Sequence, residues 1–147
     1  RLHTPASPHY GCDVDALCTP DALDRALARH PGTIVIVPHL GAARMAETAA
    51  LLDRHAHFHL DSTMTLNRFV PTGTTFHVGP DDRAEALLAH ALDVVRAFPG
   101  RVLYGTDFPN VPYEWDRELS ILAEAGLPDE DLRAILGGNA KRLFKIA

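Results

Sequence analysis

A short apolar run followed by an acidic residue constrains the fold of this chain more than any other feature. The stretch RVLYGTDFPN spans residues 101–110, and its apolar part, Val102–Tyr104, is prone to form a strand. Gly105 ends that strand, Asp107 follows it, and segments with helical spacing lie on both sides. A buried strand between two helices is typical of a parallel α/β sheet. The carboxyl ends of such strands carry the chemistry in these folds, so Asp107 stands where a functional residue is expected.

The same alternation of strands and helices runs through the rest of the chain. Thr33–Val37 is continuously apolar and β-branched, as in a strand buried on both faces, and His57–Asp61 alternates polar and apolar residues. Leu2–Thr4 reads as the end of a further strand, and residues 62–80 are expected to form a long loop. Helices are expected at residues 20–30, 42–54, 81–98, 114–125 and 129–136, with a short one after Asn139.

Four strands in alternation with helices describe half of a TIM-type (β/α)8 barrel. A complete barrel takes about 250 residues, whereas this chain has 147. We therefore expect an α/β fold in which residues 1–147 form a single unit that contains strands 5–8 and the helices after them. The amino-terminal half of the barrel is expected to be missing, and the chain to be a fragment.

Composition excludes several classes of function. A net charge of −5 without a basic run argues against nucleic acid as a partner, and no apolar stretch approaches the roughly 20 residues that cross a membrane. The two cysteines, Cys12 and Cys18, are too few for a disulfide framework, so we expect a reduced, cytoplasmic setting. A small-molecule substrate is the partner that remains.

Three candidate site residues lie at the ends of different predicted strands. His3, His39 and Asp107 would point into one mouth of the barrel, although they come from distant parts of the chain. Two imidazoles and a carboxylate suit a divalent metal such as zinc, which makes hydroxide available near neutral pH. The alternative is that each residue only caps its strand or forms a local hydrogen bond.

Three further residues are candidates for binding substrate. Arg44 lies about one turn after the His39 position and can meet a carboxylate as a bidentate donor, although a solvated arginine at a helix start is an equal alternative. Asp61 ends the strand His57–Asp61, and Asn110 follows the acidic residue of the last strand. Both are expected to contribute to the pocket.

Three motifs carry a resemblance to a known family. The stretches VPHLG around His39, LYGTDFP around Asp107 and ILGGNAKRLF around Asn139 resemble the carboxyl half of amidohydrolase-related metal-dependent hydrolases, the branch that includes aminocarboxymuconate-semialdehyde decarboxylase. The resemblance covers nearly the whole chain and implies a (β/α)8 barrel. It also implies that His3 binds the metal, that His39 orients a metal-bound water or the substrate, and that Asp107 binds the metal and handles the proton.

The activity implied by the resemblance is hydrolysis or non-oxidative decarboxylation of a small organic acid, lactone or amide. The family carries a His-x-His pair on its first strand, which this sequence lacks; His57 and His59 have that spacing but stand where the family has strand 7. The alternative is an inactive half-barrel that serves as a structural or binding module. Such a piece is expected to form homo-oligomers or to associate with the missing half.

Overall fold

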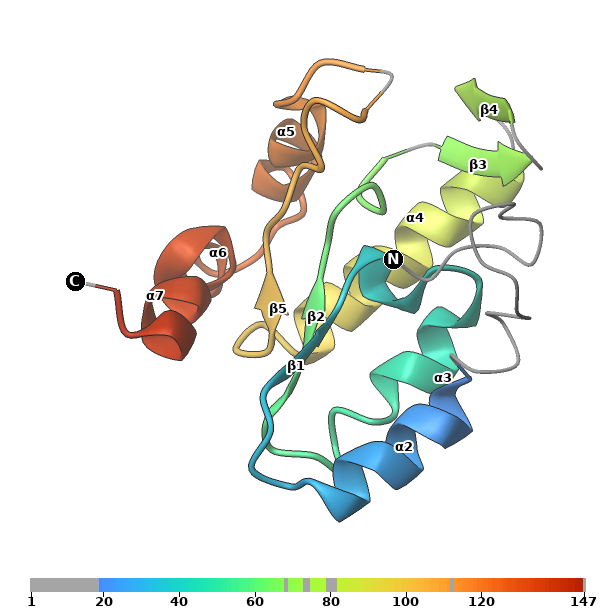
Figure 1. The fold of residues 1–147 in the computed structure, drawn as a ribbon. Helices are drawn as coiled ribbons and strands as arrows, with labels where there is room; N and C mark the ends of the chain where they lie inside the picture. Colours follow the sequence, from blue (N-terminus) through green and yellow to red (C-terminus); the bar gives the residue numbers. More distant parts are fainter. Residues whose placement is uncertain (1–18, 68, 73–74, 79–81, 112, 147) are drawn as a thin grey trace.

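A three-stranded parallel sheet lies at the centre of the molecule (Figure 1). The computed structural model describes residues 19–67, 69–72, 75–78, 82–111 and 113–146. The sheet has the order β1-β2-β5 and consists of β1 (Val35–Val37), β2 (Phe58–Asp61) and β5 (Val102–Leu103). These strands lie where the apolar runs predicted them, although β1 and β5 are shorter than expected. The predicted strand at Leu2–Thr4 lies outside the described residues.

The register of the sheet aligns the carboxyl ends of the three strands. Leu60 of β2 pairs with Val37 on one side and with Val102 on the other. Because all three strands are parallel, the residues that follow them reach the same edge of the sheet. The α/β class predicted from the sequence is therefore confirmed.

Two long helices form where their capping and spacing predicted them. Helix α2 (Pro20–Arg29) begins at Thr19, whose Oγ1 accepts a hydrogen bond from the Ala22 amide at 3.1 Å. Proline at the first helical position and Asp21 in the first turn add to this start signal. Helix α4 (Asp82–Ala97) is the longest of the described helices, and its last turn ends with basic Arg96.

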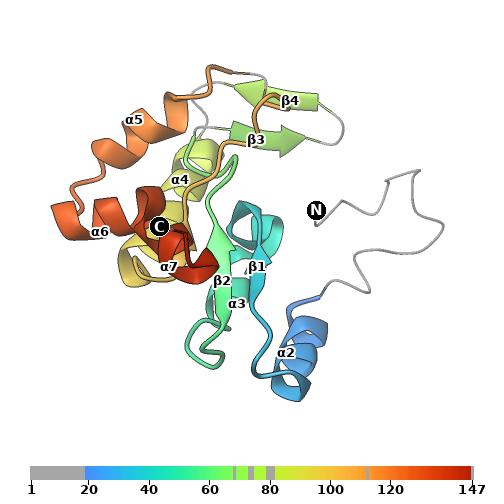
Figure 2. The same ribbon diagram turned by 60° about the vertical axis from the view of Figure 1, so that its left-hand side comes forward.

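Three short helices follow the last strand. These are α5 (Arg117–Ala123), α6 (Asp129–Arg133) and α7 (Asn139–Phe144), with a π-helical turn at Ala134–Gly138 between the last two. Figures 1 and 2 show α2 and α3 (Met45–Ala49) on the β1 side of the sheet and α6 and α7 on the β5 side. None of the described helices combines the length and apolar character that crossing a bilayer needs.

The helix predicted at residues 42–54 is largely wrong. A 3-10 turn occupies His39–Arg44, and helix α3 covers only Met45–Ala49. The reason lies in the backbone after β1, where His39, Leu40 and Ala42 all have positive φ values, which a right-handed helix excludes. Alanine content favoured a helix here, but the conformation of the strand-end turn displaces its start.

The long loop predicted at residues 62–80 contains a β-hairpin instead. Strands β3 (Phe69–Thr72) and β4 (Thr75–Val78) pair antiparallel, with Phe69 opposite Val78. A two-stranded ribbon has free edges, so it accommodates Pro71 within β3. Both views place the hairpin beyond the carboxyl ends of the sheet strands, next to α4 (Figures 1 and 2).

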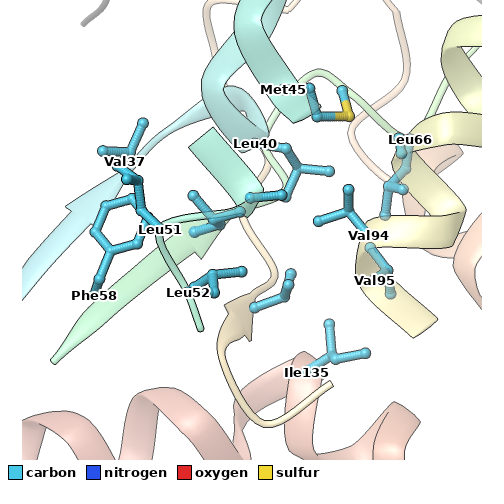
Figure 3. Packing of buried hydrophobic residues seen from close by; sticks show 14 of the residues in the cluster. Val37, Leu40, Met45, Leu51, Leu52, Phe58, Leu66, Val94, Val95 and Ile135 are labelled. Atoms are coloured by element: carbon cyan, nitrogen blue, oxygen red, sulfur yellow. The ribbon is translucent and has the colours of Figure 1, made fainter. Parts of the chain in front are cut away.

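The hydrophobic core lies where the central strand meets the surrounding helices (Figure 3). Phe58 and Leu60 of β2 have no exposed surface, and Val95 of α4 and Ile135 of the π-helical turn pack into the same cluster. Each fully buried side chain of this size contributes about 1.5–3 kcal/mol through removal of apolar area from water.

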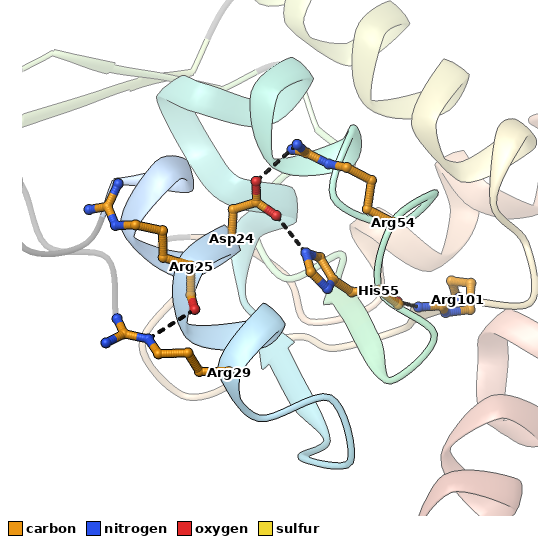
Figure 4. Close-up of polar contacts among 6 residues, drawn as sticks. All are labelled: Asp24, Arg25, Arg29, Arg54, His55 and Arg101. Atoms are coloured by element: carbon orange, nitrogen blue, oxygen red, sulfur yellow. Dashed lines mark hydrogen bonds and ion pairs between the residues drawn. The ribbon is translucent and has the colours of Figure 1, made fainter.

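A polar cluster at the amino ends of the sheet strands links α2 to the segment before β2, and β2 to the residue before β5 (Figure 4). His55 Nε2 lies 2.6 Å from Asp24 Oδ1, and Arg54 Nη1 lies 2.9 Å from Asp24 Oδ2. The hydrogen bond from His55, together with the charge of Arg54, holds the pKa of Asp24 below its usual value. Arg101, which precedes β5, donates to the carbonyl of Phe58 from Nε at 2.9 Å. These contacts set the strands at their amino ends.

Candidate functional site

His39 is held by a hydrogen bond from one nitrogen of its ring. It follows β1 with a φ of 57°, and its Nδ1 lies 2.9 Å from the Thr63 carbonyl oxygen. A carbonyl oxygen only accepts, so Nδ1 carries a proton, and in the neutral ring Nε2 presents the lone pair. This tautomer is the one that a general base or a metal ligand acting through Nε2 requires.

Asp61 and Thr63 form a tight turn beside His39, and Gly105 packs against this turn. Asp61 Oδ1 accepts from the Thr63 amide at 2.6 Å and also from the Thr63 hydroxyl. A Cβ at Gly105 would lie 2.3 Å from Thr63 Oγ1 and 2.7 Å from Asp61 Oδ1. Only glycine allows the end of β5 to approach this closely. The glycine of the strand-end motif therefore makes room for the turn that holds His39.

Asp107 reaches the same edge from the third strand. It is half-buried, has a φ of 54°, and its carbonyl accepts from the Asn110 amide at 2.7 Å. Within the described residues, no hydrogen bond joins its carboxylate to His39 or Asp61, and Asn110 is exposed. The structure therefore places Asp107 at the predicted edge without a direct contact to the other candidates.

A buried carboxylate lies behind the turn. Glu118 of α5 is 1% exposed and accepts hydrogen bonds from Asn67 Nδ2 at 2.7 Å, Tyr113 OH at 2.9 Å and the Met64 amide at 3.1 Å. Burial raises the pKa of Glu118 to about 7, and the nearby charge of Asp61 adds to the rise, while the three donors oppose it. Burial likewise raises the pKa of Tyr113.

The remaining candidates lie in different surroundings. Arg44 is exposed and pairs with Glu47 at 3.1 and 2.5 Å, which lowers the pKa of that carboxyl. His59 is buried on β2, and burial, with the charge of Arg101, lowers its pKa. His57 is exposed and precedes the strand. The structure therefore does not present the two histidines as a pair.

Two members of the predicted ligand set, His39 and Asp107, lie among the described residues. His3 lies outside the described residues, and among those described no three His, Cys, Asp or Glu side chains gather around a possible ion. The residues present supply a carboxylate, Asp107, and an imidazole, His39, with Nε2 unprotonated. Both are ligand types that zinc binds, so this donor chemistry fits a divalent metal.

The family model described as amidohydrolase matches residues 2–146. The chain therefore belongs to the amidohydrolase family, as its three motifs suggested. No curated protein matches the sequence. The narrower likeness to the aminocarboxymuconate-semialdehyde decarboxylase branch stays a prediction.

Solved structures with a similar fold include an amidohydrolase in two crystal forms and a decarboxylase. An amidohydrolase from Burkholderia multivorans with bound HEPES has a TM-score of 0.64 at 21% identity, over 87% of this chain and 50% of its own. Its zinc-bound form has a TM-score of 0.60 at 21% identity, over 87% and 49%. For 5-carboxyvanillate decarboxylase from Sphingomonas paucimobilis the TM-score is 0.55 at 16% identity, over 95% and 44%. The chain thus spans half the length or less of these structures, and the likeness shows the barrel-type fold.

Sequence reasoning missed Glu118. Its one signal is position, since it precedes the fully buried Leu122 by four residues and so shares the inward face of α5. The charge of Glu118, taken alone, indicates a solvated side chain. Its contact with Met64 joins residues 54 positions apart, which no local pattern encodes.

Proposed function

We propose that this chain carries part of a metal-dependent active site for hydrolysis or non-oxidative decarboxylation of a small organic acid, lactone or amide. The observation that carries the proposal is the 2.9 Å contact between His39 Nδ1 and the Thr63 carbonyl oxygen at the carboxyl end of a parallel sheet, from which the tautomer of His39 is inferred. Membership of the amidohydrolase family supports it, as do a zinc-bound amidohydrolase and a decarboxylase among the structures of similar fold.

His39 and Asp107 divide the proton chemistry in this proposal. His39 Nε2, with its lone pair exposed to the site, accepts a proton or orients a reacting oxygen. Asp107 and His3 would hold the metal, and in hydrolysis Asp107 would accept a proton from the attacking water and pass that proton to the leaving atom as its bond to the carbonyl carbon breaks. Zinc, when bound, acts as a Lewis acid on a carbonyl oxygen and lowers the pKa of water. Substrate contacts are assigned to Arg44, Asp61 and Asn110.

The alternative, a half-barrel that acts only as a module for a partner chain, receives less support. Its main argument is an open strand at the edge of the sheet. The outer side of β5, however, is partly covered, because the Tyr104 amide donates to the Ile135 carbonyl at 3.0 Å and Asn139 Nδ2 donates to the Val102 carbonyl at 2.7 Å. Association with another chain remains a prediction.

Zinc binding tests the proposed site. Asp107→Asn suits this position because asparagine also adopts a positive φ, while the substitution removes the charge. We expect about one zinc per wild-type chain and an affinity at least about tenfold lower in the variant, measured by titration calorimetry and elemental analysis. The matched control is Asp53→Ala at an exposed aspartate.

Each outcome decides a different part of the proposal. Wild-type affinity in Asp107→Asn would show that Asp107 is not a ligand. Zinc bound by neither the wild type nor the control would refute a metal site in this chain.

A further inference from the structure

The buried carboxylate of Glu118 and the ring of His39 contact opposite ends of one peptide group. Glu118 Oε2 accepts from the Met64 amide at 3.1 Å, and the Thr63 carbonyl accepts from His39 Nδ1 at 2.9 Å. That amide and that carbonyl belong to the peptide bond between Thr63 and Met64. A peptide group is planar and rigid, so fixing its N–H also fixes the direction of its carbonyl.

The peptide group also transmits the electrostatic effect of the Glu118 carboxylate to its carbonyl oxygen. A carboxylate at the N–H polarises the group and makes the carbonyl oxygen a stronger acceptor, because linked hydrogen bonds strengthen one another at low dielectric. The strengthened acceptor holds the Nδ1 proton of His39 more firmly. The lone pair then stays on Nε2, the nitrogen left for the site.

The rest of the cluster keeps Glu118 in place for this contact. Asn67 Nδ2 and Tyr113 OH both donate to Oε1, at 2.7 and 2.9 Å, which leaves Oε2 for Met64. Met64 has a φ of 57°, a backbone conformation that residues other than glycine rarely adopt. The hydrogen bond that the Met64 amide donates to a buried carboxylate offsets the cost of that conformation.

We infer that Glu118 is a positioning residue for His39, acting through the Thr63–Met64 peptide group to fix the orientation and tautomer of the imidazole. The catalytic meaning of this inference rests on the proposed function. The coupling itself is a property of the folded chain without metal or substrate.

Glu118→Gln separates this coupling from simple packing. The amide has the same shape, but it offers one acceptor where the carboxylate offers two. Three hydrogen-bond donors face the side chain at position 118. The NH2 group of the glutamine must therefore lie against another donor, either the Met64 N–H or the Asn67 NH2. The peptide group between Thr63 and Met64 then loses its anionic partner, even where the fold is kept.

The experiment is a long-range ¹H–¹⁵N spectrum of the imidazole nitrogens, recorded without added metal at about pH 8, where an ordinary histidine is neutral. Signals of His39 are assigned by their loss in His39→Gln. We expect the wild type to show a protonated Nδ1 and an unprotonated Nε2. In Glu118→Gln the two nitrogen shifts are expected to move towards each other as the Nδ1–H fraction drops.

Two matched variants serve as controls. Glu124→Gln changes an exposed glutamate at the end of α5, and Tyr113→Phe removes one donor from Oε1 but leaves the Met64 contact. Both are expected to keep the wild-type shifts of His39. An equal change in Tyr113→Phe would assign the effect to the cluster as a whole and overturn the coupling through the peptide group.

Other results overturn the inference directly. An Nε2–H tautomer in the wild type, or unchanged His39 shifts in a folded Glu118→Gln, would do so. Should that variant not fold, Glu118→Asp takes its place with the same expectations, since the shorter side chain withdraws the carboxylate from Met64. None of these measurements involves zinc. A chain that binds no metal would therefore leave the coupling between Glu118 and His39 standing, and loss of the coupling would leave the metal site standing.

Discussion

At the scale of single residues, the turns at the carboxyl edge of the sheet rely on unusual backbone conformations. His39, Met64 and Asp107 have φ values of 57°, 57° and 54°, each following a different strand. Such conformations persist only where neighbouring groups fix them, and they gather at functional sites. Here the fixing contacts come from the Thr63 carbonyl, from Glu118 and from the Asn110 amide. Strain at all three strand ends therefore supports this edge as the site.

The buried carboxyl of Glu118 predicts an unusual dependence of stability on pH. Its pKa in the folded chain is about 7, above the ordinary value of 4.5, so the folded state binds this proton more tightly than the unfolded state. The contribution of this protonated carboxyl to the free energy of unfolding is complete below about pH 4.5 and is lost as the pH rises through 7. The shift corresponds to about 3 kcal/mol.

This pH effect can be isolated by a difference measurement. The free energy of unfolding in urea, wild type minus Glu118→Gln, is expected to fall by about 3 kcal/mol from pH 4.5 to pH 8. Asp61 and Tyr113, which face Glu118, are present in both proteins, as is His59, whose lowered pKa acts in the opposite direction. Glu124→Gln is the control. A difference that stays constant with pH would show that the pKa of Glu118 is not raised.

At the scale of elements, Asn139 joins the last helix to the last strand. Its side chain is 1% exposed, and Nδ2 donates to the Pro99 and Val102 carbonyls, each at 2.7 Å. Oδ1 accepts from Arg142 Nη2, which also donates to the Gly100 carbonyl, in both cases at 2.9 Å. The asparagine of the third family motif thus has a structural role. It fixes the start of β5, and so the path of the strand that ends near Asp107.

Asn139→Ala tests this role. The substitution leaves two carbonyls without their donor, at about 1–3 kcal/mol for each group that stays buried. We expect a loss of about 3 kcal/mol in the free energy of unfolding, measured in urea. Lys141→Ala, at an exposed position of the same helix, should change stability by less than about 0.5 kcal/mol. Equal stability of the two variants would show that Asn139 does not fasten β5.

Helices and strands were predicted correctly where the sequence signal is local, and incorrectly where their structure depends on distant residues. The apolar run Thr33–Val37 and the capping signal at Thr19 gave β1 and α2 correctly. Helix α3 was overestimated because the left-handed turn after β1 depends on the Thr63 carbonyl, 24 positions away from His39. The edge that carries the site followed from strand ends alone. The partners that orient its residues, Thr63 and above all Glu118, are tertiary contacts that no pattern encodes.

At the scale of the whole molecule, the C-terminal segment covers the outer side of β5. Barrels have no free strand edges, and isolated sheets protect theirs with a helix or loop. Ile135 and Asn139 provide such cover by accepting from the Tyr104 amide and donating to the Val102 carbonyl. An associating chain that pairs with β5 must displace these contacts. The cover and a neighbouring strand therefore compete for the same backbone groups.

This competition predicts that Asn139→Ala associates more than the wild type. Sedimentation velocity over a concentration series should show a larger associated fraction in the variant, because the β5 edge is easier to open. Loss of stability alone also promotes association, so the control is Leu27→Ala, a core truncation in α2 away from β5 that costs about 2–5 kcal/mol. We expect more association in Asn139→Ala than in this control at equal concentration. Equal association would show that the edge of β5 is not the route by which chains meet, and would direct attention to β1 instead.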